Sequence, residues 1–227
     1  MAHAQKNMTV PLIARRTFAS WTIPQPIAVS PLMKEGGFGV FEGLLSGAGR
    51  KQMLAEALSL LKRAQLCHEP VSDTEEVRGG NPARCFLSAP GEEVQQALYH
   101  APGMLRFLAK VSGTCLVPTG ERGTFTYYAR AGDHLSIHRD IETCDVAVIT
   151  CLYDNAHPAG QAGMLSLYPG RLFEPLSAIR GAPDRGAVRL RLLEGQTIVM
   201  FGGVMPHCVL PVSEGQIRIV SVLCYRV

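Results

Sequence analysis

From residue 122 onward the chain reads as a series of short β-rich runs, and this pattern constrains the fold more than any other feature of the sequence. Glycine, proline, asparagine or aspartate stands at most joints between runs, as is typical of turns between strands. The runs are Thr124–Arg130, Leu135–Arg139, Val146–Tyr153, Met164–Tyr168, Val188–Leu193, Thr197–Phe201, His207–Val212 and Gln216–Tyr225. No helical periodicity separates them. The pattern favours an antiparallel sandwich or jelly roll over an alternating βαβ sheet.

The first half of the chain has a helical character. Leu54, Ala57, Leu58 and Leu61 follow the i, i+3, i+4, i+7 spacing of an amphipathic helix. A second helical region is expected from about residue 92 to 110, interrupted at Pro102-Gly103. An edge strand is expected around residues 39–45, and the polar stretch 66–90 is expected to be a loop.

Together these signals predict a mainly β fold with helical cover (α+β). We expect a single domain over residues 1–227. Residues 1–121 would supply an extended segment and covering helices packed on one face, and residues 122–227 a jelly-roll, cupin-like core.

Composition excludes several classes of protein. Hydrophobic residues make up 47% of the chain and charged residues only 18%, against about a quarter in average soluble proteins, so global disorder is excluded. The net charge is +3 and no basic run is longer than a pair such as Arg15-Arg16, which gives no indication of nucleic-acid binding. No apolar stretch reaches eighteen residues, so no membrane span is expected.

Seven cysteines are present, an odd number without a C-x-x-C spacing. This predicts neither a disulfide framework nor a zinc ribbon. We therefore interpret the cysteines as small buried hydrophobic residues in a reducing compartment, and expect a cytoplasmic protein.

The residues that indicate chemistry are His138, Asp140 and His207. Side chains at i and i+2 of a strand share one face, so His138 and Asp140 can converge while Arg139 points away. His207 begins a late strand and is a candidate third ligand. Two imidazoles and one carboxylate leave three metal positions open, which suits non-haem Fe(II), whereas a structural zinc site needs a fourth protein ligand.

The letters His138-Arg139-Asp140 also open the catalytic loop of protein kinases. Kinases carry asparagine five residues after this aspartate, but this chain has Asp145 there and lacks an Asp-Phe-Gly motif. A kinase is therefore excluded.

Arg218 is the second chemical signal. It lies eleven residues after His207 and is flanked by Ile217 and Ile219 in the last β-rich run. Burying an arginine is costly unless it meets an anion. A bidentate contact with a ligand carboxylate would supply one.

In order along the chain, these features resemble the 2-oxoglutarate/Fe(II)-dependent oxygenases, most closely their prolyl-4-hydroxylase-like branch. The matching features are Tyr128, His138-x-Asp140, Ala162-Gly163-Met164-Leu165, Phe201 with Pro206-His207, and Arg218, with a weaker match at residues 39–46. The resemblance covers about residues 122–227. It implies a double-stranded β-helix with iron held by His138, Asp140 and His207.

The same resemblance implies that Arg218 pairs with the distal carboxylate of 2-oxoglutarate, and that Tyr128 or Tyr153 donates a hydrogen bond to it. Asp154 replaces an apolar residue that the family usually carries after this tyrosine. The implied cofactors are Fe(II), 2-oxoglutarate as cosubstrate and ascorbate as an optional reductant.

The implied activity is hydroxylation of an unactivated C–H bond, with 2-oxoglutarate converted to succinate and CO2. We expect a small amino-acid-like or natural-product substrate, because the chain has little beyond the barrel and its cover. One alternative is a peptidyl, prolyl-type hydroxylase. Another is a non-catalytic cupin-like metal-binding or sensor protein. No nucleic-acid or membrane partner is expected, and the oligomeric state is open.

Each of these residues also has an ordinary structural interpretation. His138 and Asp140 could form a solvated pair at a strand end, and Arg218 a structural ion pair. Tyrosines such as Tyr128 and Tyr153 are often core residues with a satisfied hydroxyl. Arg84, Arg130 and Arg139 could meet a substrate carboxylate or lie on the surface. His134, predicted in a loop, could face the substrate.

Overall fold

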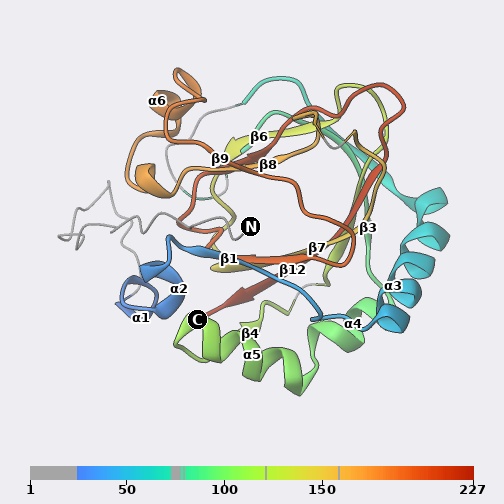
Figure 1. Cartoon of the computed structure of the whole chain (residues 1–227), viewed down its shortest axis with the longest axis horizontal. Helices are drawn as coiled ribbons and strands as arrows, with labels where there is room; N and C mark the ends of the chain where they lie inside the picture. Colours follow the sequence, from blue (N-terminus) through green and yellow to red (C-terminus); the bar gives the residue numbers. More distant parts are fainter. Residues whose placement is uncertain (1–24, 73–77, 79, 121, 158) are drawn as a thin grey trace.

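The computed structural model describes residues 25–72, 78, 80–120, 122–157 and 159–227, so residues 1–24 of the predicted extended segment lie outside the described part. One antiparallel sheet curls until its two halves face each other around a central space (Figure 1). Its strand order is β1-β10-β7-β12-β5-β3-β6-β11-β8-β9, with β2 paired to β3 and β4 paired to β12. This is the predicted double-stranded β-helix type of architecture.

The eight predicted strands are confirmed, with ends that differ by a few residues. They are β5 (Thr124–Tyr128), β6 (His134–His138), β7 (Val146–Asp154), β8 (Leu165–Leu167), β9 (Val188–Leu190), β10 (Thr197–Met200), β11 (His207–Val209) and β12 (Arg218–Arg226). A short helix, α6 (Leu176–Arg180), interrupts the series between β8 and β9. Its apolar side packs over Ile137 and Cys208 on the outer face of the sheet.

The first half of the chain contributes more strand than its sequence indicates. The predicted edge strand is β1 (Phe38–Phe41), which pairs with β10. The prediction that residues 66–90 form a loop is wrong, because this stretch contains most of β2 (Gln65–Glu69) and all of β3 (Arg84–Pro90). β3 enters the sheet between β5 and β6, and its pairing with both neighbours outweighs the polar local composition.

Helices cover the outer side of the layer that contains β7, β12 and β5, here called the larger layer, as predicted. They are α1 (Gln25–Ala28), α2 (Pro31–Lys34), α3 (Gly47–Leu60), α4 (Glu93–Tyr99) and α5 (Pro102–Ser112), with β4 (Val117–Pro118) after them. The predicted break in the second helical region is confirmed, since Pro102 begins α5. No described helix is long and apolar enough to cross a membrane.

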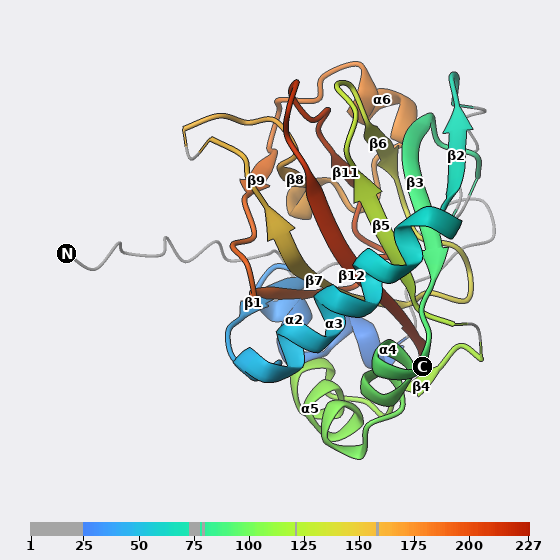
Figure 2. The ribbon, with the colours of Figure 1, turned by 90° about the vertical axis from the view of Figure 1, so that its right-hand side faces the viewer.

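Figure 2 shows α3 lying across the outer face of β12 and β5. Its buried side chains are Met53, Ala57 and Leu60, whereas Leu58 is 51% exposed. The predicted apolar stripe was therefore wrong by part of a turn, because Leu58 and Leu61 belong to the solvent side. The helix is tied to the sheet by the Tyr127 hydroxyl, which donates to the carbonyl of Ala57 at 2.7 Å.

Candidate metal centre

Three side chains converge inside the curled sheet: His138, Asp140 and His207. His138 ends β6 and His207 begins β11, and the two residues are paired directly in the antiparallel register. Their ring centroids lie 4.2 Å apart. Oδ1 of Asp140 lies 3.4 Å from Nε2 of His138 and 3.5 Å from Nε2 of His207. Asp140 lies two residues beyond the end of β6, in a segment without regular secondary structure, and its carboxylate still faces the two imidazoles.

Hydrogen bonds fix the orientation of both imidazoles. Nδ1 of His138 lies 2.9 Å from the carbonyl oxygen of Ser136, and Nδ1 of His207 lies 2.8 Å from that of Met205. Because a carbonyl can only accept, each Nδ1 carries the proton and donates it. Each Nε2 is then left to present a lone pair toward Asp140. Ligating histidines typically have this arrangement, in which the second ring nitrogen is tied to an outer partner.

The three groups perturb one another electrostatically. Burial acts to raise the pKa of Asp140, but the imidazoles, His207 most strongly, outweigh it and hold that pKa well below its usual range. Burial and the neighbouring His207 lower the pKa of His138. Burial also acts to lower the pKa of His207, but Asp140 outweighs it and the pKa is raised. The set offers one ionised carboxylate and two imidazoles, which fits a divalent transition metal with open positions.

The second oxygen of Asp140, Oδ2, faces the protein rather than the imidazoles. It lies 3.7 Å from Sγ of Cys144. A Cβ atom added at Gly202 would overlap with Oδ2, so this glycine leaves the room that the carboxylate occupies. The backbone of Gly202 also accepts a hydrogen bond from the Asp140 amide at 2.9 Å.

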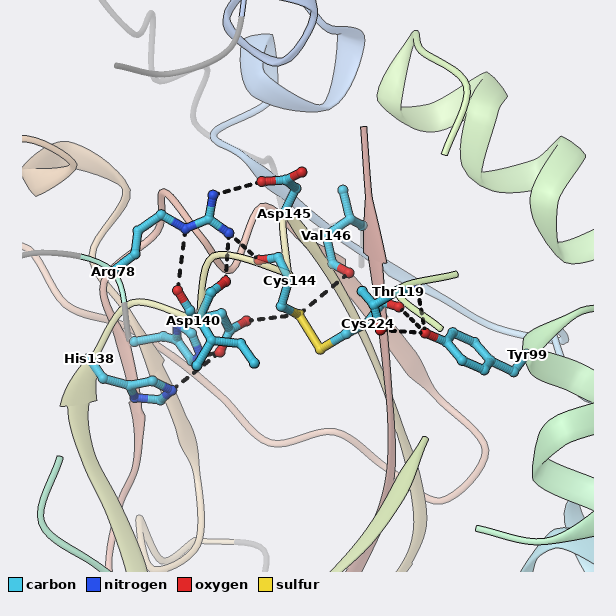
Figure 3. The surroundings of a disulfide bond; sticks show 11 residues. Arg78, Tyr99, Thr119, His138, Asp140, Cys144, Asp145, Val146 and Cys224 are labelled. Carbon is cyan, nitrogen blue, oxygen red and sulfur yellow. Dashed lines mark hydrogen bonds and ion pairs between the residues drawn. A yellow bond between two sulfur atoms is a disulfide. The ribbon is translucent and has the colours of Figure 1, made fainter. Parts of the chain in front are cut away.

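Arg78 holds the loop that carries Asp140 (Figure 3). Its guanidinium donates to the carbonyls of Asp140 at 3.3 Å, Ile141 at 2.7 Å and Cys144 at 2.8 Å. The fourth group that the guanidinium contacts is the carboxylate of Asp145, at 2.7 Å in a buried ion pair. Nothing in the sequence around Arg78 indicated this role, because arginine is common in polar segments of the kind that surrounds it.

Cys144 and Cys224 form a disulfide bond, which corrects the prediction that all seven cysteines are reduced packing residues (Figure 3). The two residues are 80 positions apart, and the bond joins the loop after Asp140 to β12. Of the cysteines read as packing residues on strands, Cys151 is buried and free, as predicted.

A cavity of about 440 Å3 lies inside the sheet and includes all three converging side chains in its wall. Much of the remaining wall is apolar, with Phe86, Leu135, Ile149, Val220 and Val222. The volume is in the range of small-molecule sites. Tyr128 and Arg218 also line this cavity, so five of the six predicted site residues share it.

Arg218 is only loosely paired with other described residues. Its side chain is buried, and among the described residues its guanidinium makes no hydrogen bond. Its nearest carboxylate is Asp154, with Nε and Oδ2 3.7 Å apart. Asp154 is shared, because it also pairs with Arg191 at 3.3 Å and accepts a hydrogen bond from Gln216 at 3.0 Å. A buried, cavity-lining guanidinium without a hydrogen bond is suited to receive an anion.

The two candidate tyrosines lie on different sides of the sheet. Tyr128 pairs with Arg218 in the register, and its ring centroid is 5.9 Å from the guanidinium carbon. Its hydroxyl has no hydrogen-bond partner within the described chain, and burial raises its pKa, so it remains a donor. Tyr153 packs on the outer side, against the cluster that includes Met53 and Ala57. The structure does not bring Tyr153 to the cavity, and Asp154 takes the inward position beside it.

Comparisons with known proteins find solved structures of similar fold, but no family model or curated sequence that matches. No protein-family model matches the chain, and no curated protein matches it significantly. A Trichoplax adhaerens prolyl hydroxylase, solved with a peptide of hypoxia inducible factor, is 17% identical with a TM-score of 0.58, over 86% of this chain and 85% of that one.

Two further solved structures have a similar fold. SnoN, a non-haem alpha-ketoglutarate-dependent epimerase of nogalamycin biosynthesis, is 16% identical with a TM-score of 0.63, over 83% of this chain and 76% of that one. HygX of Streptomyces hygroscopicus, solved with nickel and 2-oxoglutarate, is 13% identical with a TM-score of 0.58, over 83% and 82%. The chain therefore has the fold of the 2-oxoglutarate/Fe(II) oxygenases, as its sequence motifs predicted.

Proposed function

We propose that this protein is an Fe(II)- and 2-oxoglutarate-dependent oxygenase that hydroxylates an unactivated C–H bond of a small amino-acid-like or natural-product substrate. The observation that carries the proposal is one cavity whose wall holds two chemically different groups. Its wall presents the ligand set His138, Asp140 and His207, and also the guanidinium of Arg218, which makes no hydrogen bond to the described residues. A metal-chelating anion with a second carboxylate satisfies both.

The metal ligands are His138, Asp140 and His207 in this proposal. Fe(II) is favoured because three protein ligands on one face leave room for a bidentate cosubstrate and dioxygen. When bound, iron and 2-oxoglutarate supply the oxidising chemistry: dioxygen is consumed, 2-oxoglutarate becomes succinate and CO2, and the substrate gains a hydroxyl group. Ascorbate is the reductant we would supply to keep the iron ferrous.

Arg218 binds the distal carboxylate of 2-oxoglutarate, and the hydroxyl of Tyr128 donates a further hydrogen bond to it. Asp140 supplies the negative charge at the metal, and the Nδ1 hydrogen bonds keep both imidazoles in the ligating tautomer. Apolar wall residues such as Val220 and Ile149 keep water scarce around the reacting groups.

Substrate class is the less constrained part of the proposal. The proteins of similar fold include a prolyl hydroxylase solved with a peptide and an epimerase from nogalamycin biosynthesis. A cavity of about 440 Å3 favours a small molecule over a folded protein surface, because cosubstrate and substrate must share it. The alternative is a peptidyl hydroxylase, and the test must distinguish it from an enzyme that acts on a small molecule.

The test has a binding arm and a turnover arm. Anaerobic Fe(II) plus 2-oxoglutarate should produce a weak visible charge-transfer band in the wild type, and Asp140→Ala and His207→Ala should abolish it. Retention of the full band in either variant would refute the ligand assignment. In air, succinate should form with a member of an amino-acid and peptide panel. A band without any succinate would instead identify a cupin-like sensor.

A further inference from the structure

The cavity wall contains a second guanidinium that the proposed function leaves unused. Arg84 is the first residue of β3, and it lines the cavity together with Phe86 and Ser88, the alternate residues of the same strand. Alternation along the strand therefore directs these three side chains to the inner face.

Arg84 carries an unpaired charge among the described residues. Its one hydrogen bond runs from Nη2 to Oδ1 of Asn81, at 2.7 Å, and it forms no ion pair with any described carboxylate. The amide of Asn81 in turn donates to Oε2 of Glu69 at 2.7 Å. This relay holds one edge of the guanidinium in place and leaves the other nitrogens free for a ligand.

The three arginines that the sequence offered as carboxylate binders can now be separated. Arg130 is largely exposed and pairs with Asp133 at 3.2 Å. Arg139 is buried and donates to the carbonyls of Leu172 and Glu174 at 2.7 and 2.9 Å. Only Arg84 of these three lines the cavity of the metal ligands.

Charge balance inside the cavity supports a role for Arg84 in substrate binding. If the proposed function holds, the charges of Asp140, Arg218, a divalent iron and a doubly charged 2-oxoglutarate cancel. Arg84 then has no direct carboxylate contact among the described residues, because Glu69, opposite it in the β2–β3 register, is linked to it only through Asn81. A guanidinium in a largely apolar wall is stabilised by one further anion, and a carboxylate matches its planar fork.

We propose that Arg84 binds a carboxylate of the primary substrate, so that the substrate class is small carboxylic acids. This inference rests on the proposed function and assigns a specificity-determining residue to it. A free amino acid or another small acid fits the class. A peptide without a carboxylate near the hydroxylated carbon does not.

The binding test uses the anaerobic band of the Fe(II)·2-oxoglutarate complex as its readout. The probes are the standard amino acids as free acids and as primary amides, which differ in charge and hardly in size. In the wild type, at least one acid should perturb the band, and its amide should bind about 10-fold to 100-fold more weakly. If no acid perturbs the band, or if acid and amide bind alike, the proposal is overturned.

Variants then assign the preference to Arg84. Arg84→Met should weaken binding of the acid about 10-fold or more and leave its amide and 2-oxoglutarate unaffected. Arg84→Lys should recover part of the preference because it restores the charge. Arg130→Met is the matched control and should behave as the wild type. Unchanged acid binding by a folded Arg84→Met protein would refute the assignment.

Failure of this inference is distinguishable from failure of the proposed function. If the wild type shows no band with Fe(II) and 2-oxoglutarate, the proposed function is at fault. If the band forms and only the acid preference is missing, the inference about Arg84 is wrong. If succinate forms with peptides that lack a carboxylate and not with acids, the peptidyl alternative replaces it.

Discussion

Oδ2 of Asp140 lies 3.7 Å from the sulfur of Cys144, and Cys144 is bonded to Cys224 in β12. A disulfide sulfur has no proton to donate, so this is a packing contact against the outer oxygen of the carboxylate. The contact links a predicted metal ligand to a central strand of the larger layer through one covalent bond. The loop after β6 is thus held by the disulfide on one side and by Arg78 on the other.

Removing the disulfide should destabilise the protein. The bond closes a segment of 80 residues, for which chain-entropy arguments give a contribution of about 4 kcal/mol to the free energy of unfolding. Denaturant unfolding of Cys224→Ala against the wild type would measure the loss. Cys115→Ser, which alters an exposed free cysteine, is the control and should leave the midpoint unchanged. Equal midpoints for wild type and Cys224→Ala would contradict the prediction.

Gly202→Ala should weaken metal binding more than it weakens the fold. The added Cβ overlaps with Oδ2 of Asp140 and displaces the carboxylate. We expect Fe(II) affinity to fall about 10-fold or more, measured by anaerobic titration. Gly170→Ala is the matched control, because a Cβ there meets open space. If both variants bind iron equally well, Gly202 does not position the ligand.

Arg218→Ala should separate cosubstrate binding from metal binding. Its guanidinium lines the cavity but is not part of the ligand set, so its loss removes a partner for the distal carboxylate and leaves the ligand set intact. We expect the 2-oxoglutarate dissociation constant to rise about 10-fold to 100-fold, with little change in that of Fe(II). Equal losses of both would identify a structural arginine.

Asp154→Asn should act in the opposite direction on the same site. It keeps the size of the side chain but removes the negative charge that Arg218 shares with Arg191. Repulsion between Asp154 and the cosubstrate carboxylate is thereby lost, so 2-oxoglutarate should bind several-fold more tightly. Two buried arginines lose their carboxylate, so stability should fall by about 3 kcal/mol. Titration calorimetry and denaturant unfolding test the two halves separately, and weaker binding would overturn the first.

Stability should decline in alkaline solution. Burial raises the pKa of Tyr127 to about 12, and its hydroxyl donates to Ala57. An unfolded tyrosine ionises near a pH of about 10. The folded state holds the proton more tightly, so this contribution is complete below about pH 10 and is lost as the pH rises toward 12. The free energy of unfolding should fall over that interval, and less steeply in Tyr127→Phe. A pH-independent stability would refute the assignment.

Much of the site could be predicted because its residues are chemically distinctive. His138, Asp140 and His207 form a ligand set at a recognisable spacing, and an arginine between isoleucines at 218 implies an anion. The cost of burying an arginine pointed to Arg218, and the family resemblance pointed to Tyr128, and the structure places these two residues opposite each other in β12 and β5. The i, i+2 spacing correctly predicted that His138 and Asp140 converge, although Asp140 lies two residues beyond the end of β6.

Other features depend on contacts between segments that are distant in sequence, so the local sequence around each residue does not indicate them. The pairing of Cys144 with Cys224 joins residues 80 positions apart, and seven cysteines allow many pairings. The face of α3 that becomes buried is set by the sheet beneath it, so Leu58 was misassigned. Likewise, Arg78 acquires its role only because folding brings its segment beside the loop after Asp140.

The place of β12 in the sheet has a consequence for how the molecule is made. β12 follows all other described strands in the chain, yet it lies between β5 and β7. During synthesis, β5 and β7 emerge first and keep unpaired edges until β12 leaves the ribosome, a state that favours mispairing and aggregation. His138 and Asp140 emerge long before His207 and Arg218. If the proposed function holds, metal and cosubstrate can bind only after β12 has been translated, and expression at low rates or with chaperones should raise the yield of protein that binds them.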